Sequence, residues 1–124
     1  MRRVLVVAVC VAALGLWPPA PAWSHAYLVR STPAARAVLA RAPERVYLWF
    51  NERLEPAYSR VSVWNREAQR VDAGDVQVAS SEPTRLSVGV PALADGAYTV
   101  KYRVLSVDGH VVEAEFGFTV RGAS

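Results

Sequence analysis

From Arg45 onward, the sequence consists of short runs in which apolar residues occupy every second position. In RVYLWF (45–50), for example, Val46, Leu48 and Phe50 fall on one face. Alternation with a period of two, in runs rich in β-branched and aromatic residues, is typical of strands buried on one side. This feature therefore predicts a chain built from β-strands.

The strand-like runs are separated by turn residues (Pro, Gly and Asp), and we expect about seven strands: 27–31, 45–50, 59–64, 76–79, 84–90, 97–107 and 111–120. Such spacing predicts an all-β, immunoglobulin-like sandwich with Greek-key connections. The Ala- and Arg-rich segment 33–42 is expected to be a loop or a single turn. DGAY (95–98) predicts a corner at which the Tyr98 hydroxyl caps a turn.

The first 24 residues have the layout of a secretory signal peptide. MRR is followed by the apolar run VLVVAVCVAALGLW (4–17) and then by PPAPAWS, which is rich in proline and small residues. The apolar run is shorter than the ~20 residues that span a bilayer, which argues against the alternative of an uncleaved anchor. We expect a signal peptide at 1–24, one domain at 25–124, and a periplasmic or secreted product.

Removal of the leader changes the composition. It takes away Arg2 and Arg3, two of the 14 basic residues, and none of the 11 acidic ones. The remaining domain is close to charge balance and lacks the basic footprint of a nucleic-acid-binding protein. Met1 and Cys10, the only sulfur-containing residues, are also lost. Without thiolate or thioether ligands, the mature domain is not expected to have a Cu(I) site. We also expect the protein to be a monomer.

His25 changes its chemistry if the chain is cut after Ser24. Ala22 and Ser24 then occupy the small positions that signal peptidase requires. A terminal histidine offers its α-amine and its ring to one metal ion, and both lose protons near neutral pH. Cleavage after Ala22 is the alternative. It leaves Trp23-Ser24-His25, in which the third-position histidine binds Cu(II) by itself.

The other histidine, His110, lies in SVDGHVV, two residues after Asp108. If strand geometry persists there, both side chains project to the same side. Together with His25 they would supply three nitrogens and one oxygen, which suits a tetragonal Cu(II) site, with nickel next. The alternative is a plain Asp-Gly hairpin turn, in which Asp108 caps the turn and the histidine is solvated.

The sequence resembles the CopC family of periplasmic copper-binding proteins. The resemblance rests on HAYLVRSTPA (25–34), RVYLWFNERLEP (45–56) and DGAYTVKYRVLSVDGHVVEAEFGFTV (95–120). It implies one Cu(II) ion per chain, held by the amine and ring of His25, by Asp108 and by His110. Glu52 matches an acidic family position near the ligands, and we expect it to hydrogen-bond the terminal amine or a bound water; the alternative is a solvated acid. Asn51, Tyr102 and Ala114 depart from the family pattern without removing a ligand.

The resemblance implies a binding protein, not an enzyme, that sequesters or delivers Cu(II) in copper homeostasis and resistance. It also implies a CopD-like membrane protein as acceptor. One alternative is a copper histidine-brace monooxygenase, although about 100 residues leave little room for a polysaccharide-binding face. A carboxylate ligand would also close a position that oxygen needs. The other alternative is an immunoglobulin-like interaction module with incidental histidines.

Overall fold

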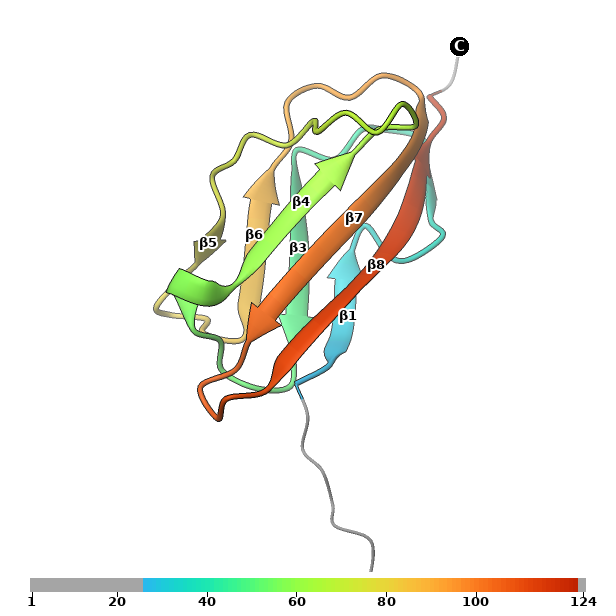
Figure 1. The fold of residues 1–124 in the computed structure, drawn as a ribbon. Coiled ribbons are helices and arrows are strands. Elements are labelled where there is room, and N and C mark those ends of the chain that lie inside the picture. The colour runs from blue at the N-terminus through green and yellow to red at the C-terminus, as the bar shows by residue number, and fades with distance from the viewer. Residues whose placement is uncertain (1–25, 123–124) are drawn as a thin grey trace, which may run out of the picture.

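The computed structural model describes residues 26–122, which form two four-stranded β-sheets packed face to face (Figure 1). The first sheet has the order β1 (Leu28–Thr32), β3 (Arg45–Phe50), β6 (Arg85–Gly89), β5 (Gln77–Val78). The second has the order β2 (Val38–Leu39), β8 (Val111–Val120), β7 (Gly96–Leu105), β4 (Arg60–Trp64). The helical structure in these residues is a single 3-10 turn, η2 (Pro56–Tyr58). The predicted all-β sandwich is confirmed.

The alternating residues form the core between the two sheets. Along β3, Val46, Leu48 and Phe50 are at most 3% exposed, whereas the residues between them are half-buried on the outer face. Alternate residues of β4 and β7 and apolar residues of β6 and β8 complete the core, and the largest fully buried side chain is that of Phe118. Within residues 26–122, no helix is long and apolar enough to cross a bilayer.

Each of the seven predicted runs overlaps a strand, and those at 45–50 and 111–120 have the predicted bounds. The expectation of a loop or a single turn at 33–42 was wrong in one respect, because β2 forms there and pairs in parallel with β8. The backbone carbonyls of Ala37 and Leu39 accept hydrogen bonds from the N–H groups of Thr119 and Arg121, both at 2.8 Å. This pairing satisfies backbone groups that an uncovered β8 edge would leave unpaired.

The tyrosine corner is also confirmed. The hydroxyl of Tyr98 donates a 2.6 Å hydrogen bond to the carbonyl oxygen of Ala94, just before the start of β7. Its ring stacks on Phe118 of β8 with the ring centroids 5.5 Å apart. The corner thus fixes the start of the long β7–β8 hairpin, whose other end carries His110.

Candidate metal centre

The loop between β7 and β8 lies beside the segment that follows β3, at one end of the sandwich. Figure 1 shows this end at the bottom, where β1 also begins. The N–H of Val107 donates to the carbonyl of Arg53 at 2.9 Å, and Glu55 N–H donates to Leu105 O at 2.8 Å. Two segments far apart in sequence are thereby joined through their backbones.

The chain enters the first sheet at the same end. The N–H of Tyr27 donates to Oδ1 of Asn51 at 2.6 Å, and the N–H of Asn51 donates back to the carbonyl of Tyr27 at 3.2 Å. Ala26 is only 1% exposed. Tyr27, two residues after His25, is therefore fixed to Asn51, the residue that precedes Glu52.

The loop from Ser106 to His110 is a tight turn. Gly109 N–H donates to the Ser106 carbonyl at 2.9 Å, and Gly109 has a φ of +89°. The hydroxyl of Ser106 accepts the N–H of His110 at 3.1 Å, and Ser106 N–H donates to the His110 carbonyl at 2.9 Å. The extended geometry assumed for Asp108 to His110 is therefore wrong, because Gly109 reverses the chain between them.

Glu52 and His110 are brought together across this end of the molecule. Oε1 of Glu52 lies 3.3 Å from Nδ1 of His110, although the two residues are 58 apart in sequence. The Glu52 side chain is 10% exposed and that of His110 is 31% exposed. When Nδ1 carries the proton and donates it to the carboxylate, the lone pair that a metal accepts lies on Nε2.

Asp108 is exposed in the turn, and no contact places it against Glu52 or His110. In the part of the chain that the structure describes, no group of three His, Cys, Asp or Glu side chains is arranged to hold a metal ion. His25, with the predicted cleavage site before it, lies outside the described residues. His25, Asp108 and His110 as ligands stay predictions, as does the part that Glu52 plays beside them.

Sequence reasoning missed two residues that organise this end. Asn51 appeared only as a departure from a family serine, yet its side chain fixes the backbone of Tyr27. Ser106 is 1% exposed and makes hydrogen bonds with its hydroxyl and its N–H to the backbone of His110. The four-residue spacing of Ser106 and His110 around an Asp-Gly turn was the available signal.

The comparisons with known proteins agree with this fold. The model of the CopC domain matches residues 28–121. The crystal structure of CopC from Methylosinus trichosporium OB3b is 38% identical and covers 81% of this chain and 97% of its own, with a TM-score of 0.76. The crystal structure of PcoC, a copper resistance protein from Escherichia coli, is 26% identical. The match covers 77% of this chain and 99% of PcoC, with a TM-score of 0.69.

A longer relative contains a similar segment. The copper transport protein CutJ of Bacillus subtilis is 28% identical over 103 residues, which are 82% of this chain but 19% of that protein. The CopC model matches well over half of the chain, and the solved structures named above superpose over nearly their whole length. The chain belongs to the CopC family.

Proposed function

We propose that this protein is an exported copper-binding protein that sequesters or delivers Cu(II) in copper homeostasis and resistance. The observation that carries the proposal is the Glu52–His110 contact of 3.3 Å, at the end where the chain enters from residue 25. Metal-binding histidines commonly donate their second ring N–H to a carboxylate, which fixes the ring and raises its basicity. Glu52 has this position relative to His110.

In this proposal, one Cu(II) ion is bound by the amine and ring of His25, by the ring of His110 and by the carboxylate of Asp108. Ala26 is buried and Tyr27 is hydrogen-bonded to Asn51, which supports a position of His25 at the end of the molecule that carries Glu52. A set of three nitrogens and one oxygen favours Cu(II) in a tetragonal geometry. Asp108 stands two residues before His110 in the same exposed turn, and in this proposal the turn changes so that its carboxylate reaches the metal.

The cellular part of the proposal follows from the leader and the family. A signal peptide at 1–24 would export the domain, and cleavage after Ser24 would create the terminal amine of His25. PcoC is named for copper resistance and CutJ for copper transport. The CutJ segment is only a fifth of a longer copper transport protein, which favours delivery to a membrane protein of the CopD type.

The proposal is tested by Cu(II) competition titrations on the secreted protein and three variants. His110→Ala removes a ligand and should cause the largest loss of affinity, while Glu52→Gln should weaken binding by about 10–100-fold. Glu115→Gln, an exposed carboxylate in the middle of β8, is the control and should leave the affinity unchanged. Unchanged affinity of His110→Ala would contradict the proposal and support an incidental histidine.

The monooxygenase alternative predicts a different result. With ascorbate and chitin or cellulose, such an enzyme would consume oxygen over many turnovers. We expect the copper-loaded protein to show no sustained turnover, because the Asp108 carboxylate would occupy the position that oxygen needs. Sustained oxygen consumption that depends on the polysaccharide would overturn the binding-protein proposal.

A further inference from the structure

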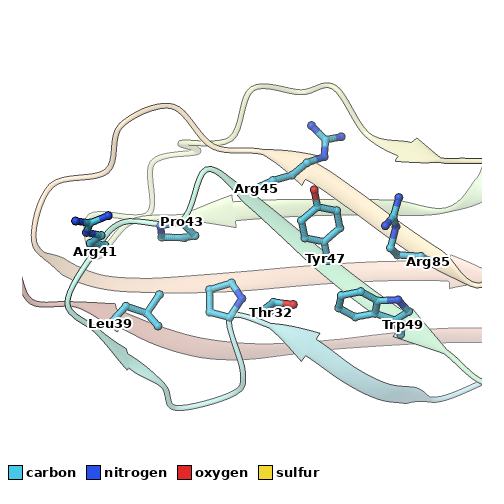
Figure 2. A pocket seen from close by; sticks show the side chains of 9 residues that line it. Thr32, Leu39, Arg41, Pro43, Arg45, Tyr47, Trp49 and Arg85 are labelled. Carbon is cyan, nitrogen blue, oxygen red and sulfur yellow. The ribbon is translucent and has the colours of Figure 1, made fainter.

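A pocket of about 470 Å³ lies on the outer face of the first sheet (Figure 2), and none of the residues that line it belongs to the candidate metal centre. Its walls are mostly apolar and come from β1, β3, the start of β6 and the connection between β1 and β3, which includes Pro33, Leu39 and Pro43. Tyr47 and Trp49 of β3 complete the apolar surface. The volume is within the range of about 300–1,000 Å³ that is usual for small-molecule sites.

The two aromatic side chains give the pocket a planar surface. Tyr47 and Trp49 point outward because the residues next to them in β3 are in the core. Residues two apart on a strand lie on the same face, so both rings are on the outer side of the sheet. Their ring centroids are 5.8 Å apart and the ring planes differ by 29°. Both rings are half-buried, so part of each surface stays accessible. A flat apolar ligand would pack against the ring surfaces that neighbouring side chains leave open.

Arginine side chains surround this surface. Arg41, Arg45 and Arg85 line the pocket, as Figure 2 shows, and come from three different parts of the chain. Arg30 lies over Trp49 with its guanidinium carbon 4.0 Å from the ring centroid, and that of Arg85 is 4.9 Å from the centroid of Tyr47. Cationic, planar groups thus stand directly at the aromatic rings.

Acidic neighbours neutralise only some of these charges. Arg45 pairs with Asp75 and Arg85 pairs with Glu82, each at 2.8 Å. Arg30 and Arg41 have no ion pair with any residue in 26–122, and Arg41 is exposed at the pocket edge. The pocket region therefore keeps an excess of positive charge, which an anionic ligand would complement.

We propose that this pocket binds a small aromatic carboxylate. The flat ring would lie against Tyr47 and Trp49, and the carboxylate would bind Arg41, whose planar fork of N–H donors matches it. The pocket shares no residue with the candidate metal centre, so this proposal does not depend on the proposed copper function. The occupant is a free small molecule and not a segment of another protein.

The test is a titration of the secreted protein followed by two-dimensional amide NMR, with 2-naphthoate as the probe. We expect saturable shifts at Tyr47 and Trp49, including the indole N–H of Trp49. Two matched compounds separate the two parts of the recognition: neutral 2-naphthamide keeps the ring, and cyclohexanecarboxylate keeps the charge. Each should bind at least about tenfold more weakly, because each lacks one group of contacts.

Variants locate the site. Arg41→Gln should weaken 2-naphthoate binding by about tenfold and leave 2-naphthamide unchanged, because only the anion contacts the guanidinium. Arg60→Gln, an exposed cation on the other sheet, is the control and should have no effect. Arg41 has no ion pair in the described chain, so its loss should not unfold the domain.

Three results would overturn the proposal. These are no saturable shift at Tyr47 or Trp49, equal binding of 2-naphthoate and 2-naphthamide, and an Arg41→Gln variant that binds 2-naphthoate as well as the wild type does.

The peptide acetyl-Gly-Phe, which ends in a free carboxylate, identifies the source of the ligand. If it binds in this pocket more tightly than 2-naphthoate, the occupant is a protein terminus and the small-molecule proposal is wrong.

Discussion

At the scale of single residues, the candidate metal centre contains the Glu52 carboxylate, which lies 3.3 Å from the ring of His110. The sequence and the family resemblance were enough to single out Glu52 and His110. They did not predict that the two touch, because the residues are 58 apart in sequence and the intervening chain, which includes β4 to β7, has to fold to bring them together. The role of Asn51 was also hidden, since its partner is the backbone of Tyr27 and backbone groups carry no sequence signature.

Asp72 allows a prediction about acid stability. Its buried side chain accepts hydrogen bonds from Val63 N–H at 2.9 Å, Arg70 Nε at 2.8 Å and Gly74 N–H at 2.9 Å. Burial acts to raise the pKa of this carboxyl, but the hydrogen bonds from Arg70 and the backbone outweigh burial, and the pKa lies below its usual 3.8. The ionised form therefore stabilises the fold above pH 3.8, and this contribution is lost as the pH falls through the lowered pKa.

We expect Asp72→Ala to lower the free energy of unfolding by about 1–3 kcal/mol at pH 7, because the N–H of the buried residue Val63 loses its partner. Urea unfolding of both proteins at pH 7 and in the acid range below 3.8 measures the difference. The gap should narrow in acid, where the wild type loses the ionised Asp72. A gap that widens at low pH would contradict this assignment.

At the scale of elements, most strands were predictable, because apolar and polar residues alternate along a strand that is buried on one face. The strand β2 was not, because Val38 and Leu39 form a strand only through the backbone partners that β8 offers. The β7–β8 turn was recognised as an Asp-Gly turn, but the same residues were also given strand geometry. The positive φ of Gly109 decides between these readings, since it reverses the chain before His110.

Gly109 in this turn and Gly74, which lies between β4 and β5, give a matched pair of glycine variants. Gly109 has a φ of +89° and Gly74 a φ of +76°, and an added Cβ would meet no atom within 4 Å at either position. Each Gly→Ala change should therefore cost only the backbone strain, about 1–2 kcal/mol, and lower Tm by several degrees. Gly109→Ala alone should also weaken Cu(II) binding, because it strains the turn that orients His110.

Calorimetry and copper titration of both variants separate stability from function. The expected result is a similar loss of Tm in the two proteins and a loss of Cu(II) affinity in Gly109→Ala only. Equal copper affinities in both variants would show that the turn conformation does not matter for the metal.

At the scale of the whole molecule, the sandwich brings the start of the first sheet, the end of β3 and the β7–β8 turn to one end (Figure 1). The fold class followed from sequence pattern, because layers of half-buried strands have few stable arrangements. The sequence pattern did not predict that these three segments meet at one end. Their meeting depends on the order of the strands and on how the two sheets pack against each other.

Copper binding at this end should depend on pH. The ring of a histidine has an ordinary pKa near 6.5 and an α-amine one near 7.7–8.0. Protons therefore compete with the metal for these nitrogens, and Cu(II) affinity should fall progressively below about pH 6–7. Competition titrations from pH 8 to pH 5 measure this dependence. An affinity that stays constant over that range would contradict nitrogen ligation.

The most direct test of the proposed site is the Cu(II) affinity of the domain beginning at His25, compared with the same domain acetylated at its α-amine. The account predicts a large loss of affinity on acetylation, at least about 100-fold, because the chelate loses one of its two nitrogens and keeps a single ring donor from His25. The mass of the secreted protein should first confirm that His25 is the terminal residue. Equal affinities of the free and acetylated forms would contradict the account.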